Sequence, residues 1–382
     1  MKLRSICALL LVVGCSAGVE VPEPDLTGME PRVIDALESA RDLVLREPQS
    51  AEAWGELAAL YDAHLLTDLA VQCYRNAVER APEEFEWAYL LAIARELQGA
   101  EPDEVIELFD RAVALRPSYA PTLVRLGDAL WRRGRYDEAR AELKRAVEIE
   151  PRIAAAHRRL GQVALTQGDA QEAAKHMARA ITLEPRDLAA YSGLAQALMR
   201  LGQGARASAI RDRAAGLEPV TNLHDPVYAE RVFMRNVSSG GAFARATAAI
   251  RDGDFPQAVS DLGIVLEMRP QDASAHYWMG MAQRRSGDGA SAITYLTRAV
   301  DLEPAMHVAH LELGRALLTE GRHAEALARF ERAAAFAPLE ADDHHRCGLA
   351  FEALGRGDDA AAAFRAAVEL QPDHPAASRL SN

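Results

Sequence analysis

Apolar residues along this chain recur at helical spacing in pairs of short segments, with polar residues between them. In residues 120–153, APTLVRLGDALWRRGRYDEARAELKRAVEIEPRI, one apolar stripe contains Leu126 and Leu130 and a second is centred on Leu143. This spacing predicts two amphipathic helices. Gly134 lies between the two stripes, and glycine readily takes the left-handed conformation that closes a helix. The unit is therefore expected to be an αα-hairpin.

The same unit repeats along most of the chain with a period of 34 residues. A proline ends each unit, because proline lacks an amide hydrogen and disfavours helix in the residue before it. The intervals are 34 residues except for one of 35 and one of 51, and the prolines are Pro48, Pro82, Pro117, Pro151, Pro185, Pro219, Pro270, Pro304, Pro338 and Pro372. Such a period indicates stacked units that are stable only against their neighbours.

Within each unit, positions 8, 20 and 27 stay small, as Gly161, Ala173 and Ala180 do in residues 154–187. Small residues allow two helices to approach to the short end of the usual distance of about 8–10 Å. This pattern resembles the tetratricopeptide repeat, and residues 51–84 carry it most fully, with Trp54, Leu57, Tyr61, Ala70, Tyr74, Ala77 and Pro82. The resemblance implies an all-α fold, an αα-hairpin solenoid or superhelix.

We predict two arrays of repeats separated by one extra helix. Residues 31–221 hold a lone N-terminal helix and five repeats, residues 239–374 hold four repeats, and residues 375–382 form a tail. The 51-residue interval leaves residues 222–238 as a linker helix between the arrays.

The linker has its own helix-start signal. Asp225 is suited to the N-cap and Pro226 to the first helical position. We therefore predict one unpaired helix over about 226–237. The alternative is an ordinary linker with a transient helix.

The first residues form a separate segment with the pattern of an export signal. Lys2 and Arg4 precede a short apolar run, and residues 1–14 match a secretory signal peptide. A membrane-spanning helix would need about 20 apolar residues. The sequence VVGC at Val12–Cys15 resembles the lipobox of bacterial lipoproteins, which implies cleavage before Cys15 and acylation of its thiol and of the new amine.

Several acyl chains make a stable anchor, since each buried methylene contributes about 0.8 kcal/mol. Residues 15–30 would then be the lipidated cysteine and a flexible tether, because they are rich in proline and acidic residues. In Gram-negative lipoproteins a residue other than Asp after the cysteine implies the outer membrane, and here it is Ser16. We expect an exported protein, lipid-anchored to the periplasmic face of the bacterial outer membrane. The alternative is an ordinary cleavable signal, with Ala17 and Gly18 near the cut site.

Composition excludes some classes of partner and site. The net charge of −13 argues against nucleic acid, whose phosphates would be repelled. Aromatic residues make up only 6%, and few stretches alternate like strands, which favours helices. No CxxC pair or zinc spacing occurs among the cysteines Cys7, Cys15, Cys73 and Cys347.

Histidines are the main candidates for other chemistry. Histidine occupies position 4 in four repeats, as His157, His276, His310 and His344. We expect them to pack between the helices of a hairpin, because successive repeats hold them too far apart to share a metal with bonds of about 2 Å. The sequence contains no GxSxG, P-loop, GxGxxG or HExxH motif. We expect no metal, no cofactor and no small-molecule substrate.

The resemblance implies that positions 2, 5, 9 and 12 of each repeat face a concave groove that binds an extended peptide or a partner helix. The candidate partner-binding residues are Phe243, Tyr277, Met281, Arg284, Leu311 and Arg315 in the second array and Trp131, Arg158 and Gln162 in the first. Aromatic and arginine side chains often carry most of the binding energy, and methionine adapts to varied shapes. A peptide with apolar anchors and an acidic group would suit the second groove. The alternative is that some of these side chains pack between repeats.

We expect a non-enzymatic, membrane-tethered scaffold or adaptor that binds partner proteins or extended peptides. Similar lipoproteins act in bacterial cell-envelope assembly, such as pilus, secretion or outer-membrane biogenesis. The alternative is an accessory subunit of a glycan or polysaccharide synthesis or export system. The repeats continue to His374, so we expect no catalytic domain.

Overall fold

The computed structural model describes residues 20–215, 217 and 225–380. Within these residues every regular element is a helix, which confirms the all-α prediction. The predicted signal peptide and Cys15 lie outside the described residues. The chain divides into two compact units, unit 1 from Met1 to Asn236 and unit 2 from Val237 to Asn382.

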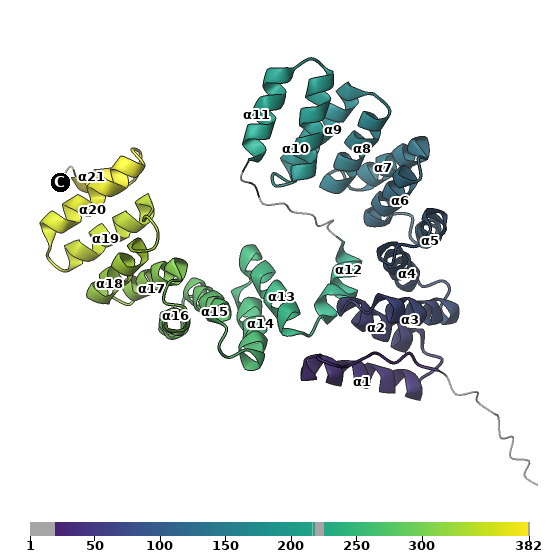
Figure 1. Ribbon diagram of the computed structural model, residues 1–382, viewed down its shortest axis with the longest axis horizontal. Helices are drawn as coiled ribbons and strands as arrows, with labels where there is room; N and C mark the ends of the chain where they lie inside the picture. Colours follow the sequence, from purple (N-terminus) through teal and green to yellow (C-terminus); the bar gives the residue numbers. More distant parts are fainter. Residues whose placement is uncertain (1–19, 216, 218–224, 381–382) are drawn as a thin grey trace, which may run out of the picture. The chain divides into compact units, whose positions relative to one another are not determined.

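Unit 1 begins with α1 (Pro31–Arg46), which packs on the first of five helical hairpins among its described residues (Figure 1). The hairpins are α2 (Ala51–Ala63) with α3 (Thr67–Arg80), α4 (Phe85–Leu97) with α5 (Pro102–Leu115), α6 (Ala120–Arg132) with α7 (Tyr136–Ile149), α8 (Ala154–Thr166) with α9 (Ala170–Leu183), and α10 (Leu188–Arg200) with α11 (Gly204–Ala214). The unit ends with α12 (Pro226–Arg231) and the 3₁₀ turn η1 (Phe233–Arg235).

Unit 2 contains four hairpins in the part that the structure describes. They are α13 (Ser239–Asp252) with α14 (Phe255–Met268), α15 (Ala273–Ser286) with α16 (Gly289–Leu302), α17 (His307–Thr319) with α18 (His323–Ala334), and α19 (Ala341–Ala353) with α20 (Gly357–Leu370). The short helix α21 (Ala377–Leu380) packs on α20.

The glycine after the first helix of most hairpins has the predicted left-handed conformation. Gly134 has a φ of +84°, and its amide donates to the carbonyl oxygen of Trp131 over 3.0 Å. Arg135 then donates to the carbonyl oxygen of Leu130 over 2.9 Å. These bonds satisfy carbonyl groups that the helix end would otherwise leave unpaired.

Within a hairpin, the glycine at position 8 touches the large side chain at position 24. A Cβ added at Gly280 would lie 2.5 Å from Cγ of Leu296 and 3.1 Å from the carbonyl oxygen of Ala292. The same contact joins Gly127 with Leu143, Gly161 with Met177, Gly314 with Phe330, and Gly348 with Phe364. The small residue is therefore required by packing, because the partner helix occupies the space of a side chain.

The described part of the predicted tether, residues 20–30, packs against other residues of unit 1. Val21 is buried, and Tyr61 donates its hydroxyl hydrogen to the carbonyl oxygen of Pro22 over 2.7 Å. Nη2 of Arg41 lies 2.6 Å from Oε1 of Glu23. The physical reason is that the buried hydroxyl of Tyr61 needs a hydrogen-bond partner, and this segment supplies it.

The extra helix is shorter than predicted and is not unpaired. Instead of a helix over 226–237, α12 ends at Arg231, and Val232 has a φ of −115° and a ψ of −60° before η1 begins. Within unit 1, η1 packs against α2. The segment bends because its side chains bind groups on the first helices of unit 1, as described below.

The packing contact predicts opposite effects for two glycine-to-alanine changes in unit 2. Gly280→Ala should lower the free energy of unfolding by about 1–3 kcal/mol, because its Cβ has no space. Gly263→Ala should raise it by up to about 1 kcal/mol, since a Cβ there meets nothing within 4 Å and alanine favours helix. Urea unfolding followed by circular dichroism measures both. Equal stability of the two variants would contradict the close approach at Gly280.

Candidate binding grooves

Each unit has a face built from first helices alone. In unit 1, α8 touches both α6 and α10, and in unit 2, α15 touches α13 and α17, and α17 touches α19. The second helices pack behind them as their hairpin partners. The candidate residues on these first helices therefore lie on one continuous face in each unit.

A cavity of about 330 Å³ crosses α6, α8 and α10 of unit 1. Its lining contains all three candidate residues of the first array, Trp131, Arg158 and Gln162, together with Gln196. The structure thus brings together side chains that the sequence places in three successive repeats.

Polar side chains in this cavity already have partners within the protein. Nε of Arg158 lies 2.9 Å from Oδ2 of Asp187. Arg159 donates from Nη1 to Oε1 of Gln162 over 2.9 Å. The charge of Arg158 is thereby balanced. Arg200, which also lines the cavity, donates from Nη1 to the carbonyl oxygen of Leu165, so a ligand would meet a polar wall with the positive charge of Arg200.

The face of unit 2 carries a chain of ion pairs, which we call the Arg–carboxylate ladder: Arg284, Glu312, Arg315, Asp343 and Arg346. Glu312 accepts from Nε of Arg284 and from Nη1 of Arg315, each over 2.7 Å. Asp343 accepts from Nη2 of Arg315 over 2.7 Å and lies 3.4 Å from Nη1 of Arg346. Both carboxylates are buried, at 5% and 0% exposure. Nη1 of Arg346 also lies 3.7 Å from Oδ2 of Asp342, so each guanidinium group of the ladder has a carboxylate beside it.

The ladder changes the interpretation of the predicted binding arginines. The sequence predicts Arg284 and Arg315 as groups for an acidic ligand, but both already pair with carboxylates of neighbouring repeats. Removing one partner of a buried ion pair costs about 3–5 kcal/mol, because the other charge is left without compensation. Arg315 holds two carboxylates and therefore has a structural role, whereas loss of Arg284 would still leave Glu312 paired with Arg315.

The apolar candidates of unit 2 differ in exposure. Phe243, Tyr277 and Leu311 remain partly exposed. Tyr277 packs on the clusters of buried side chains on both sides of it, and its ring lies edge-on to Trp278 at 5.2 Å. Met281 is only 6% exposed and belongs to the core. Met281 thus packs between repeats, the alternative that the sequence left open.

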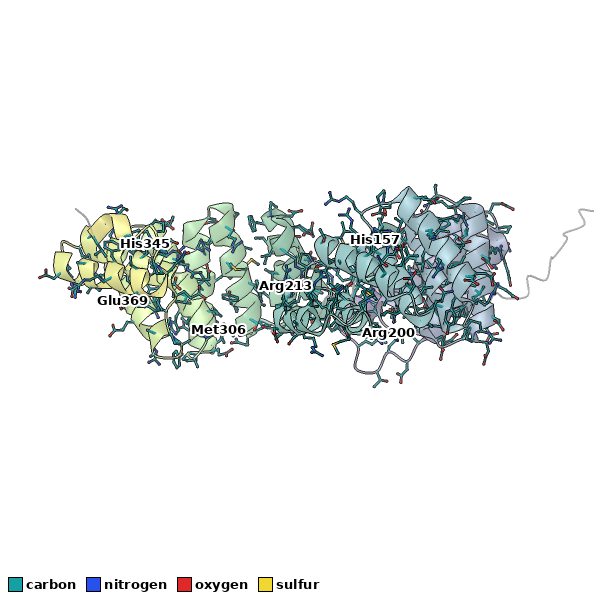
Figure 2. All side chains as sticks on the ribbon, turned by 90° about the horizontal axis from the view of Figure 1, so that it is seen from above. His157, Arg200, Arg213, Met306, His345 and Glu369 are labelled. Atoms are coloured by element: carbon teal, nitrogen blue, oxygen red, sulfur yellow. The ribbon has the colours of Figure 1, made fainter. Side chains whose placement is uncertain are left out.

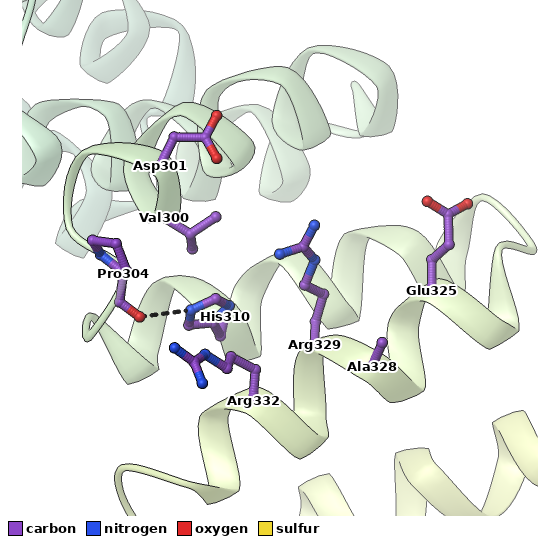
Figure 3. Close-up of a pocket in the computed structure, with 8 residues that line it drawn as sticks. All are labelled: Val300, Asp301, Pro304, His310, Glu325, Ala328, Arg329 and Arg332. Atoms are coloured by element: carbon purple, nitrogen blue, oxygen red, sulfur yellow. Dashed lines mark hydrogen bonds between the residues drawn. The ribbon is translucent and has the colours of Figure 1, made fainter.

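Three of the four position-4 histidines make the same hydrogen bond to the backbone. Nε2 of each lies near the carbonyl oxygen of the proline six residues earlier, at 3.3 Å for His157, 3.0 Å for His276 and 3.1 Å for His310. Figure 2 labels His157, and Figure 3 shows the bond from His310 to Pro304. Trp54 donates in the same way from Nε1 to Pro48 over 3.0 Å. Because a carbonyl oxygen only accepts, each histidine carries a hydrogen on Nε2.

A second cavity of about 490 Å³ lies beside His310 among α16, α17 and α18 (Figure 3). Its charged lining consists of Asp301, Glu325, Arg329 and Arg332. Two positive and two negative groups balance, so the cavity has no preference for a ligand of one charge.

Within the described ranges, no group of three or more His, Cys, Asp or Glu residues is arranged to hold a metal ion.

Burial lowers the pKa of two of these histidines, His157 and His310. The bond to the proline carbonyl opposes this shift, but nearby cationic side chains add to it. Both histidines are therefore more easily protonated in the unfolded chain than in the folded protein.

One occupied region of the first-helix face was not predicted from the sequence. The start of the unit 1 groove, on α2, α4 and the first turn of α6, binds the chain's own residues 225–236. The available signal was the acidic character of α2 and α4, which carry Glu52, Glu56 and Glu86.

Among the described helices, none is both long enough and apolar enough to cross a membrane.

Comparison with protein families gives a match over well over half of the chain. A model described as tetratricopeptide repeat matches residues 59–120, 124–185, 243–306, 279–341 and 347–381. A second model with the same description matches residues 164–224. No curated protein matches the chain.

Solved structures with a similar fold have low sequence identity. PilF of Pseudomonas aeruginosa is 15% identical over 70% of this chain and 98% of its own, with a TM-score of 0.34. A tetratricopeptide repeat protein of Parabacteroides merdae is 16% identical over 69% and 97%, with a TM-score of 0.34. YrrB, described as having an unusual peptide-binding site, is 17% identical over 72% and 97%, with a TM-score of 0.27.

The lowered histidine pKa values predict a loss of stability in mild acid. As the pH falls below about 6.5, the unfolded chain binds protons that the folded protein binds only at lower pH, so the free energy of unfolding decreases. Replacing both His157 and His310 with Gln keeps an N–H donor for the proline carbonyl but removes the titration. Urea midpoints measured between pH 7.5 and 5 should therefore fall less in this double variant than in the wild type.

The exposed His307 provides the control for this experiment. His307→Gln should leave the acid-induced fall of the urea midpoint unchanged. An equal fall in the double variant and the wild type would show that His157 and His310 are not responsible.

Proposed function

Because the chain belongs to the tetratricopeptide repeat family, we propose that it is a non-enzymatic scaffold that binds an extended peptide of a partner protein along the first-helix face of unit 2. The single observation that carries this proposal is the juxtaposition of partly exposed apolar side chains with the Arg–carboxylate ladder. Tyr277 and Leu311 supply apolar contacts. The ladder beside them supplies guanidinium N–H groups, among them those of Arg284.

The chemistry of the face defines the peptide that would suit it. Aromatic and arginine side chains carry a large share of binding energy at protein interfaces. The bond from Arg284 to Glu312 uses Nε, one of the five N–H groups of a guanidinium. Other N–H groups of Arg284 are thus available to an acidic side chain or a terminal carboxylate. The ligand would have apolar anchors and one acidic group.

We further propose that the protein works in a bacterial cell-envelope assembly, held to a membrane by lipid on Cys15. The VVGC sequence at Val12–Cys15 supports this proposal. Glu20, where the described chain begins, is the fifth residue after Cys15. Five residues span at most about 18 Å, so unit 1 would lie close to the membrane surface.

The proposed groove predicts a large effect of a double substitution in unit 2. Tyr277→Ala combined with Arg284→Ala should weaken capture of envelope-protein partners by more than about 2 kcal/mol, or roughly 30-fold, if both are hot spots. Quantitative pull-down from an envelope fraction measures the capture, and circular dichroism checks the fold.

A matched control comes from the second helix of the same hairpin. Tyr295→Ala with Arg298→Ala removes the same residue types from α16 and should leave capture unchanged. Recovery of the same partners at unchanged strength by the Tyr277 and Arg284 variant would move the site to the cavity of Trp131 and Arg158.

The proposed anchor predicts that Cys15→Ala releases the protein from membranes without loss of helical content. The acyl chains would be lost, while the folded units do not depend on Cys15. Cell fractionation and labelling with radioactive palmitate measure the two effects. Absence of label from the wild-type protein would refute the anchor and leave the groove proposal intact.

A further inference from the structure

Residues 225–236, which we call the groove segment, lie on the first helices of unit 1. The segment comprises α12 and η1, and Figure 1 shows it beside α2. Its partners are on α2, on α4 and at the start of α6, more than 100 residues away in the sequence. Two charged side chains of opposite sign hold it there.

The first anchor is Asp225, whose side chain is 6% exposed. Tyr89 donates its hydroxyl hydrogen to Oδ2, and Tyr119 donates to Oδ1, each over 2.7 Å. Nη2 of Arg125 lies 3.5 Å from Oδ2 and balances the charge. The hydroxyl oxygen of Tyr119 also accepts from the amide of Val227 over 3.1 Å. A buried carboxylate with this many donors is recognised specifically.

The second anchor is Arg231, which lies among three carboxylates. It donates from Nε to Glu86 over 2.7 Å and from Nη1 to Glu56 over 2.9 Å and to Glu52 over 3.0 Å. Its guanidinium carbon lies 5.1 Å from the ring centre of Trp87. Three acidic side chains around one cation form a site for a guanidinium group.

The end of the segment is also bound. Val232 is 2% exposed, and Nη2 of Arg235 lies 2.7 Å from Oε2 of Glu56. Asn236 donates from Nδ2 to the carbonyl oxygen of Ala63 over 3.0 Å.

The contacts differ from those of a helix that belongs to a hydrophobic core. The large apolar side chains Phe233 and Met234 are 40% and 49% exposed, while Asp225 is almost fully buried. Polar recognition therefore contributes a large part of the binding. Release of the segment would newly expose Val232, but Phe233 and Met234 are already largely exposed, so exchange for another ligand is feasible.

The groove positions of the repeat supply the partners. Glu52 and Glu86 occupy position 2 of their repeats, and Tyr89 occupies position 5. A segment that only connects two arrays does not require hydrogen-bond and ion-pair partners at the groove positions, whereas a bound ligand does.

We infer that the groove segment is a tethered ligand of unit 1, which occupies a peptide site specific for an acidic residue followed six residues later by an arginine. Tethering a ligand to its own site raises its effective concentration, to about the millimolar range for short linkers. A free peptide of the same chemistry at micromolar concentration would then be excluded from the wild-type protein. The site is separate from the unit 2 face of the proposed function and stands or falls independently of it.

The test uses the full chain and a fluorescent peptide with the sequence of residues 222–238, NLHDPVYAERVFMRNVS. In the host chain, Asp225→Ala with Arg231→Ala removes both anchors and should vacate the site. Fluorescence anisotropy should show the peptide binding to this variant at least tenfold more tightly than to the wild type. Equal binding to the two chains, or none to either, would overturn the inference.

Specificity is tested on both sides of the contact. A peptide carrying Asp225→Ala and Arg231→Ala should not bind, and Tyr119→Phe in the vacated host should weaken binding of the normal peptide, because Asp225 and Val227 lose their bond to the hydroxyl. Tyr136→Phe, a tyrosine on α7, is the matched control and should have no effect. Binding that is insensitive to these changes would contradict the site.

A second variant of the full chain tests the same inference in case the first variant, with Asp225→Ala and Arg231→Ala, misfolds. Arg231→Glu keeps Asp225 and its partners but places a negative charge among Glu52, Glu56 and Glu86, so it should also admit the peptide. If both hosts retain their helical signal and exclude the peptide, the inference is wrong. A wild-type protein that is dimeric in solution and dissociates on peptide addition would assign the segment to a second copy of the chain and overturn the tethered arrangement.

Discussion

Both units depend on the close approach of the two helices in each hairpin, which a glycine or alanine at position 8 permits. At Gly280 and Gly348 an added Cβ would lie 2.5 Å and 2.3 Å from the partner side chain. The second helix of each hairpin packs closely against one side of the first helix. Another side of the first helix then packs against the first helix of the next hairpin. The first-helix face that we propose as a binding site is therefore a consequence of this packing.

Charge pairing determines what these faces can recognise. Burying an unpaired carboxylate costs several kcal/mol of folding free energy, about the cost of losing its counter-charge. Each buried carboxylate on the face therefore requires a cation beside it. Glu312 and Asp343 meet arginines of adjacent repeats in unit 2. In unit 1, Asp225 of the groove segment supplies a second carboxylate for Arg125, beside Glu96 of the preceding repeat. The groove segment, although distant in sequence, thus provides a carboxylate like those that neighbouring repeats provide in unit 2. Selectivity for a ligand then depends on the N–H and O–H groups that these ion pairs do not use.

The position-4 side chains show why different residue types serve one role. Trp54, His157 and His310 share a ring N–H that reaches the carbonyl oxygen of the proline ending the previous unit. That proline stops the helix, and its own carbonyl then needs a donor. Histidine donates this hydrogen bond whether it is neutral or protonated, but burial disfavours its protonated form. Histidine in place of tryptophan therefore adds a dependence on pH that tryptophan lacks.

The sequence by itself determined the helices, their pairing into hairpins and the position of Gly134 at a left-handed turn, because these depend on residues within one period of 34. It also located Trp131, Arg158 and Gln162 on one face. Only the tertiary structure decided that Arg284 pairs with Glu312, that Tyr61 holds Pro22, and that Asp225 returns to Tyr89. The last of these contacts joins residues 136 positions apart. Periodicity records which residues face a neighbouring helix, but the partner of a charged or hydroxyl group is set by distances across the stack, which no local pattern contains.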